Sequence, residues 1–356
     1  MPKRIGFLYG VFVSERNCIR AERLMAKNKT DNKMAVHIGE NAERYGKALS
    51  QMLKTGTWVP SPNREITIKD SYKGKTRDLK IPCLLDQSVQ YAWLNIACPY
   101  IEKRNYYYNC GSIPGAGQTR AVKGLKKWLG KKKNPPKYGA ITDIRHFYDT
   151  CPHRTIMRGL RKIFKDERFL HVAEIILWSM SRNGVGLAIG HPSSHWFANV
   201  ALMEMDHELR EKFPDVHFTR YMDDIAFCSR NKRHIRKAVL WVIEKVRSLG
   251  MEIKGTWQVF QIRLRGITFL SYRFFHGFTL LTKPLMYRIS RAVRKASVNL
   301  TVHAAQVVTN YVCGIMKWCN SYNFRKEYVY PHISIKKCRE VISHEARRIL
   351  AEARAV

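Results

Sequence analysis

Apolar residues recur along most of the chain at spacings typical of helices and strands, and glycine, proline and charged residues divide this pattern into elements. The stretch NAERYGKALSQMLK (41–54) predicts a helix, and DQSVQYAWLNIACPYI (86–101) predicts a second, mostly apolar helix. Between them, GTWVPSPNREITI breaks the first helix and resumes as extended chain, and YKGKTRDLKIP (72–82) predicts a basic hairpin. Two helical stretches are expected in the region 154–181.

The second half of the chain mixes strands with helices. YGAITDI (138–144) predicts a strand, and VHFTRYMDDIAFCS (216–229) predicts a strand, a tight turn and a second strand. One helix is expected to begin around Pro192, and a later helix is expected to end at Gly250. The apolar residues at helical spacing are Phe197, Val200, Ala201 and Met205 in the first, and Ile235, Ala238, Val239, Val242 and Val246 in the second.

The last third of the chain continues this mixture. MEIKGTWQVF (251–260) and GITFLSYRFF (266–275) are expected as two more strands, and the chain from about residue 284 is expected to be basic and largely helical. The sequence shows no internal repeat. The irregular alternation of strands and helices favours an α+β fold with an antiparallel layer over a doubly wound parallel sheet.

Composition narrows the class of partner. The 356 residues suffice for one large domain or two ordinary ones, and the apolar fraction of 45% excludes a chain that is disordered by composition. The net charge is +35 and is spread along the chain. This excess indicates a polyanionic partner held over a large surface, most commonly nucleic acid. Ribosomal and anionic-membrane binding are the alternatives, and the length argues against a simple ribosomal tail protein.

The nine cysteines are scattered and never form a Cys-x-x-Cys pair. Reduced, mostly buried thiols are therefore expected, and a zinc site is not. No apolar run is as long as a membrane span, and the short apolar stretch after the basic N-terminus lacks a cleavage-like end. We therefore expect a cytoplasmic protein without a signal peptide or a membrane contact.

Three acidic residues stand at the ends of apolar stretches. Asp143 ends the apolar strand YGAITDI, and Asp223 and Asp224 are adjacent in RYMDDIAF, 80 residues further on. If tertiary folding joins them, their carboxylates repel one another unless cations lie between them, and oxygen ligands favour Mg²⁺. The alternative is that Asp143 caps a strand and the pair forms a polar turn, which is the better interpretation of each residue taken alone. The joint pattern favours the cation site.

Several motifs resemble those of reverse transcriptases. RYMDDIAF is similar to the family's Tyr-x-Asp-Asp hairpin, YGAITDIRHFYD to its first catalytic motif, and GVGLAIGHPSSHWFANVAL to its dNTP and template motif. LGMEIKG, RGITFLSYRFF and IPCLLDQSVQYAW resemble further motifs, in the family's order, so that the resemblance runs from about residue 60 to 335. It implies an α+β right-hand polymerase with fingers, a palm whose antiparallel sheet packs on helices, and a small helical thumb.

The same resemblance implies a division of the chain into five segments. The expected segments are an N-terminal region and fingers with the basic hairpin (1–85), a first palm segment with the first catalytic motif (86–153), a fingers insertion (154–185), a second palm segment with YMDD and the primer grip (186–275), and a basic helical thumb (276–356).

The resemblance also implies an activity, RNA-directed DNA polymerisation by two-metal nucleotidyl transfer. Asp143 and Asp223 match the two principal metal ligands and Asp224 matches the third acid, for two Mg²⁺ ions that Mn²⁺ could replace. Lys254 matches a proton donor to pyrophosphate, and the alternative is an ordinary surface lysine on a strand. The expected substrates are dNTPs, with a structured template RNA and an RNA/DNA duplex.

Five residues match positions that hold the incoming dNTP. Lys75 and Arg77 lie in the basic hairpin, and Arg77 best matches the residue that grips the triphosphate, because guanidinium suits bidentate phosphate contacts. Tyr148 matches the aromatic gate that excludes a ribose 2′-OH, and Ile189 and Gly190 lie in the dNTP motif. The alternatives are a solvated charged hairpin, a core aromatic and an ordinary turn glycine.

Two further sets of residues match the nucleic-acid contacts of the family. Phe269, Leu270 and Tyr272 match the primer-grip hairpin, although they could simply be core residues. The basic residues of the expected thumb recur at near-helical spacing and fit contacts to duplex phosphates, although a solvated helix face would look the same; they are Arg288, Arg291, Arg294 and Lys295.

The dNTP motif departs from the family pattern. Ala188, Ile189 and Gly190 stand where Pro-Gln-Gly is usual, and the run from Ile189 resembles the aliphatic-Gly-x-x-x-Ser-Gln motif of diversity-generating retroelement enzymes, with His195 in place of Gln. That type implies a bacterial or phage enzyme that copies a template-repeat RNA with errors at adenines. It also implies a small basic accessory protein, and possibly an oligomer.

Two alternatives remain open from the sequence. One is a phage-defence reverse transcriptase that uses a dedicated non-coding RNA. The other is a non-catalytic, maturase-like RNA-binding protein that kept the polymerase shape. The three acids and Tyr148 argue against the second, because RNA binding alone needs no acid cluster in a strongly basic chain.

Overall fold

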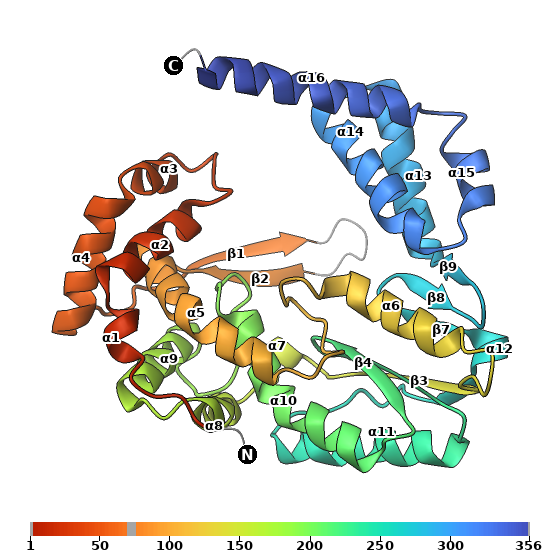
Figure 1. The fold of residues 1–356 in the computed structure, drawn as a ribbon, viewed down its shortest axis with the longest axis horizontal. Helices are drawn as coiled ribbons and strands as arrows, with labels where there is room; N and C mark the ends of the chain where they lie inside the picture. The colour runs from red at the N-terminus through yellow and green to blue at the C-terminus, as the bar shows by residue number, and fades with distance from the viewer. Residues whose placement is uncertain (1–2, 70–75, 355–356) are drawn as a thin grey trace.

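Four helices near the N-terminus form one end of the molecule in the structure, a computed structural model that describes residues 3–69 and 76–354 (Figure 1). The second helix packs against the third and fourth and against the long α5. Its start is fixed by Ser14, whose side chain accepts a hydrogen bond from the backbone N–H of Asn17. The helices predicted at 41–54 and 86–101 are confirmed as α4 and α5. The five helices are α1 (Tyr9–Phe12), α2 (Glu15–Ala26), α3 (Lys33–Glu40), α4 (Ala42–Thr55) and α5 (Leu84–Arg104).

A two-stranded hairpin projects from this helical end across the middle of the molecule (Figure 1). Its strands, β1 (Arg64–Lys69) and β2 (Thr76–Ile81), are antiparallel, with Arg64 opposite Ile81. The basic hairpin predicted at 72–82 is real but begins earlier, because the preceding extended segment supplies its first strand. Residues 70–75, between the two strands, lie outside the described residues, and Lys75 is one of them.

The central sheet has the strand order β4-β5-β3-β6 and is antiparallel throughout. Ile225 and Phe227 of β5 belong to one hydrophobic core, whereas Ala226 and Cys228 belong to a second core on the other face. Because both faces are covered, β5 reads as a continuous apolar run and not as an alternating one. The strands predicted around the YMDD turn are confirmed. The four strands are β3 (Tyr138–Asp143), β4 (His217–Tyr221), β5 (Asp224–Ser229) and β6 (Val259–Gln261).

Helices cover both faces of this sheet. α11 contacts β3, β5 and β6, α10 packs against α11, and α6 contacts β4. Residues Phe197 and Val200 of α10 and Val239 and Val242 of α11 are buried in the first core, as their spacing predicted. The two helices expected in the region 154–181 are confirmed as α8 and α9. The helices are α6 (Gly117–Leu129), α7 (Phe147–Thr150), α8 (His153–Ile163), α9 (Glu167–Met180), α10 (Ser194–Lys212) and α11 (Lys232–Ser248).

The segment after α11 differs from its prediction. The stretch 251–260 is mostly irregular, and its strand content is limited to the start of β6 and an isolated bridge between Ile253 and Ile144. The stretch 266–275 is not one strand but two, which turn at Leu270 and Ser271 with φ of +49° and +68°. Two successive residues at positive φ match the twist of a tight hairpin, which an apolar pattern cannot reveal. The elements are α12 (Ile262–Arg265), β7 (Ile267–Phe269), β8 (Tyr272–Phe274) and β9 (Thr279–Leu281).

The C-terminal region is helical and basic, as predicted. It follows the three-stranded sheet β7-β8-β9 and extends away from it (Figure 1). Leu285, Ile289 and Val293 of α13 are buried in the second core, which also includes residues of α6. α14 packs against α13 and α16. The elements are α13 (Lys283–Val298), α14 (Val302–Thr309), the π-helix η1 (Asn310–Ile315), the 3-10 helix η2 (Met316–Trp318), α15 (Tyr322–Tyr328) and α16 (Ile335–Arg354).

The α+β fold class with an antiparallel sheet on helices is therefore confirmed, while the division of the chain into five segments stays a prediction. All nine cysteines are free, five of them buried and four partly buried. Burial raises the pKa of Cys110 to about 11, which favours its thiol form. Within residues 3–69 and 76–354, no helix combines the length and apolar character needed to cross a membrane.

Candidate active site

The register of the central sheet brings the three predicted acids together. Asp143 at the end of β3 lies directly opposite Asp224 at the start of β5. Asp223 lies in the two-residue turn between β4 and β5, which we call the acid turn, together with Met222. Strand alternation places Asp143 and Asp224 on the same side of the sheet, the side that faces the second core. Residues 80 positions apart in the sequence thus meet at one edge of the sheet.

The acids influence one another electrostatically. Burial is the largest cause of the raised pKa of Asp223, and the negative charge of Asp143 raises it further. Lys254 and Arg77 act in the opposite direction. The carboxylates of the cluster therefore repel one another. Two cations lie within electrostatic reach of them, Arg77 on β2 and Lys254 in the segment after α11.

Lys254 neutralises some of the charge of this cluster. Its Nζ lies 2.7 Å from both carboxylate oxygens of Asp143 and donates a hydrogen bond to Oδ2. Its backbone N–H donates to the backbone carbonyl of Asp143 at 2.9 Å. Oδ1 of Asp143 is buried and accepts no hydrogen bond from the described residues, so its contact with the Lys254 ammonium is an ion pair without an aligned hydrogen bond. As they stand, the described side chains form no ready-made set of three metal ligands.

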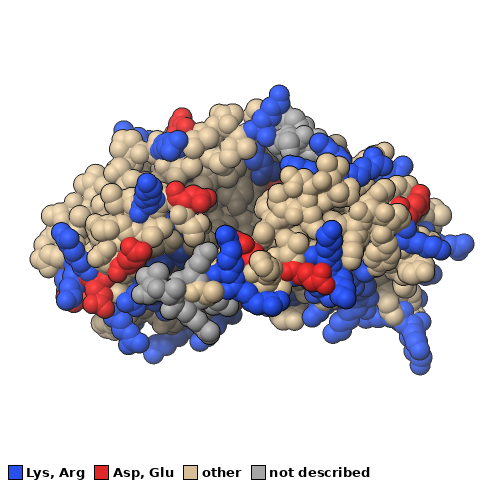
Figure 2. All heavy atoms as spheres, turned by 90° about the horizontal axis from the view of Figure 1, so that it is seen from above, with Lys and Arg blue, Asp and Glu red and all other residues tan. Residues whose placement is uncertain are grey.

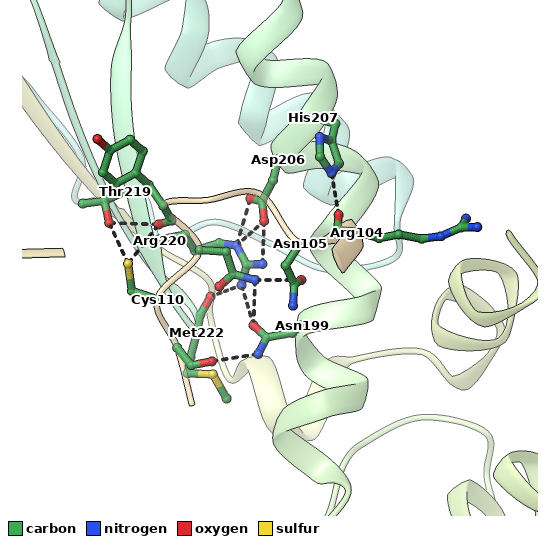
Figure 3. Close-up of polar contacts among 12 residues, drawn as sticks. Arg104, Asn105, Cys110, Asn199, Asp206, His207, Thr219, Arg220 and Met222 are labelled. Atoms are coloured by element: carbon green, nitrogen blue, oxygen red, sulfur yellow. Dashed lines mark hydrogen bonds and ion pairs between the residues drawn. The ribbon is translucent and has the colours of Figure 1, made fainter. Parts of the chain in front are cut away.

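A buried ion pair supports the acid turn from behind (Figure 3). Arg220 of β4 and Asp206 of α10 are both 0% exposed, and Nη2 of the arginine lies 2.6 Å from Oδ2 of the aspartate. Nε of Arg220 donates to both carboxylate oxygens, at 2.9 and 3.0 Å. Complete burial raises the pKa of Asp206, and the guanidinium opposes that rise. The fork-to-fork geometry fixes β4 on α10.

The same arginine reaches the acid turn itself. Nη1 of Arg220 donates to the backbone carbonyl of Met222 at 2.9 Å and to Oδ1 of Asn199 at 3.4 Å (Figure 3). Met222 has a φ of +56°, a left-handed conformation that is strained for a non-glycine residue. A Cβ on Gly111 would lie 2.5 Å from the Met222 backbone nitrogen, so only glycine fits there. Asn199 also donates to the Gly111 carbonyl at 2.8 Å, which holds this close approach.

Of the predicted dNTP residues that the structure describes, Tyr148 and Arg77 lie within electrostatic reach of Asp223, and Ile189 and Gly190 contact β2. Tyr148 is partly buried against the first core, and burial followed by the charge of Asp223 raises its pKa. Ile189 accepts a backbone hydrogen bond from Lys80 of β2 at 2.9 Å. Gly190 has a φ of +118°, and a Cβ there would lie 2.7 Å from the Lys80 carbonyl. The glycine is thus required by a close approach to the hairpin backbone, which the sequence did not reveal.

The histidines of the dNTP motif are enclosed. His191 is buried, with Nδ1 3.0 Å from the Gln90 amide and Nε2 2.9 Å from the Asn63 side chain. Burial, followed by the charge of Lys80, lowers the pKa of His191 to about 4. His195, which stands in place of the family's Gln, lies in the first turn of α10 beside Trp196, and burial lowers its pKa as well.

The other predicted contacts lie farther along the chain. Phe269 and Tyr272 are buried in the second core, and the Tyr272 hydroxyl donates to the Ile315 carbonyl at 2.9 Å. Leu270, in the turn of this hairpin, accepts a hydrogen bond from Gln118 through its carbonyl. Of the three predicted primer-grip residues, only Leu270 therefore lies outside the buried core. The four basic residues predicted for a thumb are exposed, away from the buried side of α13; they are Arg288, Arg291, Arg294 and Lys295.

Arg220, Asp206 and Asn199 are residues of the site that the sequence analysis missed. Asp206 lies among buried residues of α10, and Arg220 lies inside a strand next to buried positions. A lone charge at a core position requires a partner, because an unpaired buried charge is costly. The sequence therefore did contain a signal: an acid, Asp206, and a base, Arg220, each at a core position of its predicted element.

Comparison with known proteins places these residues in a family. Residues 68–274 match the family model of the reverse transcriptase (RNA-dependent DNA polymerase). Protein YkfC of Escherichia coli (strain K12) is 28% identical over 179 residues, which are 46% of this chain and 45% of that protein. The group II intron-encoded protein LtrA of Lactococcus lactis subsp. cremoris is 26% identical over 182 residues, 48% of this chain and 30% of that protein. The chain thus spans less than half the length of these relatives.

Among solved structures, apo telomerase from Candida tropicalis aligns with 86% of this chain and 63% of its own, with a TM-score of 0.49 and 12% identity. Telomerase from Candida albicans in complex with a TWJ fragment of telomeric RNA aligns with 75% and 57%, with a TM-score of 0.45 and 12% identity. The family model covers more than half of the chain, from β1 to the end of β8, and includes the acid turn. The chain belongs to the reverse transcriptase (RNA-dependent DNA polymerase) family.

Proposed function

We propose that this protein is an RNA-directed DNA polymerase that copies an RNA template into cDNA by nucleotidyl transfer. The observation that carries the proposal is the register that sets Asp143 opposite Asp224, next to the turn that holds Asp223. In a chain of net charge +35, carboxylates gathered at one point serve no purpose in binding phosphates. Family membership supports the same activity.

The three acids are the residues that would hold two Mg²⁺ ions, or Mn²⁺ in their place. When bound, the ions would activate the attacking 3′ oxygen and stabilise the leaving pyrophosphate. Carboxylate oxygens are the ligands that Mg²⁺ prefers, and the buried Oδ1 of Asp143 lacks a hydrogen bond among the described residues. Lys254 holds Asp143 when no other cation does, and we propose that it gives a proton to the pyrophosphate once displaced from the carboxylate.

Residues on the hairpin side would hold the dNTP. Arg77 is exposed on β2, yet its charge acts on Asp223, so its guanidinium stands within electrostatic reach of the acids. We propose that it binds the triphosphate, with Lys75, and that the Tyr148 ring excludes a ribose 2′-OH. The backbone at Ile189 and Gly190, held by β2, would form the wall of the nucleotide site.

The nucleic acid would lie across the hollow that Figure 2 shows on one face of the molecule, with lysine and arginine side chains around it. We propose that this hollow receives an RNA/DNA duplex, with the cations of α13 on its phosphates. The turn of the β7–β8 hairpin, including Leu270, would contact the primer through its backbone, because Phe269 and Tyr272 are buried.

Primer extension tests the proposal. The wild type should incorporate dNTPs on an RNA template with Mg²⁺, and Asp223→Asn should lose at least about 100-fold in rate, because Asn keeps the shape but not the charge. Asp149→Asn is the matched control, since this nearby carboxylate is 76% exposed and outside the cluster. Equal incorporation by the wild type and Asp223→Asn would contradict the proposal, provided that both unfold at the same denaturant concentration.

A finer proposal concerns fidelity. The apolar Ala188-Ile189-Gly190 run supports an error-prone enzyme of the diversity-generating retroelement type, because fewer polar contacts at the base mean less discrimination between right and wrong pairs. We propose that such an enzyme copies a structured RNA, works with a small basic accessory protein and can form an oligomer. Sequenced cDNA should show an excess of substitutions opposite template adenines, and an even distribution over the four bases would contradict this subtype.

A second candidate is RNA binding without catalysis. The net charge of +35 is the observation that favours it, because phosphate contacts alone account for a strongly basic chain. This candidate predicts RNA binding by the wild type without any incorporation, and no effect of Asp223→Asn on either property. The primer-extension experiment separates the two candidates.

A further inference from the structure

Two surface cavities adjoin beside α8 and α9. These two helices pack against each other, and Figure 1 shows where they lie in the fold. The larger has a volume of about 930 Å³ and the smaller about 500 Å³. Trp178 and Asn183 line both of them. The Trp178 side chain is 51% exposed, on the boundary between the two hollows. We call the two cavities together the α8–α9 groove.

A row of arginines borders the larger cavity. Arg154, Arg158 and Arg161 follow one another along one side of α8 over about 10 Å of helix, and all three are exposed. The opposite side of α8 is buried through Ile156 and Leu160. Over residues 3–69 and 76–354, none of the three guanidinium groups is paired with a carboxylate, whereas the neighbouring Lys162 is paired with Glu204. The row is therefore available to an external polyanion.

The smaller cavity lies beside residues that contact the dNTP motif. Lys80 lines it, and the same residue holds Ile189 and packs against Gly190 through its backbone. Asn63 also lines it, and its amide donates to the Ser179 carbonyl while its oxygen meets His191. The groove thus extends from Asn63 and Lys80, which contact the dNTP motif, to the arginines of α8.

The chemistry of the groove fits one form of nucleic acid. An exposed aromatic ring beside the arginine row offers a stacking surface for a base and phosphate contacts on the side of α8. Glu174 also lines the larger cavity, and on the other side of the ring Lys80 is paired with Glu65 at 3.8 Å. The bases of a duplex are already stacked inside it, whereas a single strand has bases free to stack. A polymerase has a single strand beside its active site by necessity, because the template ahead of the copied position is still unpaired.

We propose that the α8–α9 groove binds the uncopied, single-stranded 5′ region of the template RNA, with a base on Trp178 and phosphates on Arg154, Arg158 and Arg161. The proposal rests on the proposed polymerase function for the identity of the strand. It does not rest on it for the binding itself, which is measured without dNTPs or Mg²⁺.

The test compares two labelled ligands by fluorescence anisotropy: a blunt RNA/DNA duplex and the same duplex with a 5′ RNA overhang. Trp178→Ala should weaken binding of the overhang ligand about tenfold relative to wild type and leave the blunt duplex unchanged. Trp178→Phe keeps an aromatic ring and should retain most of the affinity. An equal loss for both ligands, or no loss for either, overturns the proposal.

The arginines are tested by salt dependence. In Arg154→Ala/Arg158→Ala, the slope of log K against log salt for the overhang ligand should shrink by about 1.4, the value for two lost phosphate contacts on a single strand. Arg236→Ala, an exposed arginine of α11, is the matched control and should leave the slope of the overhang ligand within error of wild type. A slope unchanged in the double variant, or equally reduced in the control, overturns the proposal.

The failure of the polymerase function would look different. In that case the wild type would incorporate no dNTPs, while the difference between the overhang and blunt ligands would persist. If instead incorporation is normal and the Trp178→Ala effect is absent, the groove proposal alone is wrong. Displacement of the overhang RNA by an acidic peptide at equal concentration would assign the groove to a protein partner and overturn it as well.

Discussion

Two ion pairs near the acid turn differ in their access to water. Asp206 and Arg220 are both 0% exposed, whereas Asp143 and Lys254 are 33% and 43% exposed. The buried pair joins a helix to a strand and adds a hydrogen bond to Met222 in the turn. The open pair joins the end of β3 to the segment after α11, and one of its carboxylate oxygens accepts no hydrogen bond from the described residues.

This difference in exposure suits the two pairs to different roles, one structural and one in the chemistry of the site. A buried pair cannot exchange its partner for water or for a cation without a large cost, so it fixes geometry. A half-exposed pair is screened, contributes little to stability and can release a carboxylate to another cation. The buried pair of Asp206 and Arg220 therefore holds the acid turn in place, whereas the exposed pair of Asp143 and Lys254 leaves a carboxylate free to bind another cation.

The largest expected effect is on the buried pair. Asp206→Asn should lower the free energy of unfolding by about 3–5 kcal/mol, because it leaves the Arg220 guanidinium buried without its counter-charge. Chemical denaturation measures this change. The double variant Asp206→Leu/Arg220→Met should be more stable than Asp206→Asn, because it removes both charges. A loss below about 1 kcal/mol in Asp206→Asn would remove the distinction between the two pairs.

A smaller effect on the free energy of unfolding is expected from His191, a buried histidine of the dNTP motif. Because the pKa of His191 lies at about 4 in the folded chain and at 6.5 in an unperturbed histidine, the unfolded chain binds more protons between these values. The contribution of His191 is complete above pH 6.5 and is lost as the pH falls towards 4. From pH 7 to pH 5 it should cost about 2 kcal/mol of unfolding free energy.

His191→Gln should remove that share of the pH dependence, since Gln keeps hydrogen-bonding capacity without a titrating group. Urea denaturation at pH 7 and pH 5 measures the difference. His171→Gln, at an exposed histidine of α9, is the matched control and should keep the wild-type dependence. An unchanged pH dependence in His191→Gln would show that folding does not lower the pKa of His191.

The smallest effect on stability is expected at the open pair. Lys254→Ala should change the free energy of unfolding by less than about 1 kcal/mol, because the pair is screened by water. The Mg²⁺ concentration for half-maximal incorporation should fall, because the lysine no longer competes for Asp143. Lys254→Arg keeps the positive charge and should keep the wild-type requirement. A rise in the Mg²⁺ requirement of Lys254→Ala would contradict the competition.

These regions also differ in how far the sequence predicted them. The acids were found because each adjoins an apolar strand, and strand alternation then limits where two such ends meet. Asp206 and Arg220 were not found, because helical and strand patterns treat every core position as apolar and say nothing of which charges pair. Their partnership depends on α10 crossing β4, which is a tertiary fact.

Other features were hidden for similar reasons. The β7–β8 turn at Leu270 and Ser271 lacks glycine, so its two positive φ angles leave no trace in the pattern. The role of Gly190 depends on the approach of Lys80 from a hairpin more than a hundred residues earlier. The α8–α9 groove exists only where segments far apart in the sequence meet around Trp178.

The central claim is that Asp143, Asp223 and Asp224 hold cations. Titration with Mn²⁺ tests it directly, with primer–template and dNTP present and binding followed by electron paramagnetic resonance. The wild type and the control Asp149→Asn should bind Mn²⁺ with the same affinity, and Asp143→Asn should bind it at least about tenfold more weakly at unchanged stability. Equal Mn²⁺ affinity in all three proteins would contradict the account.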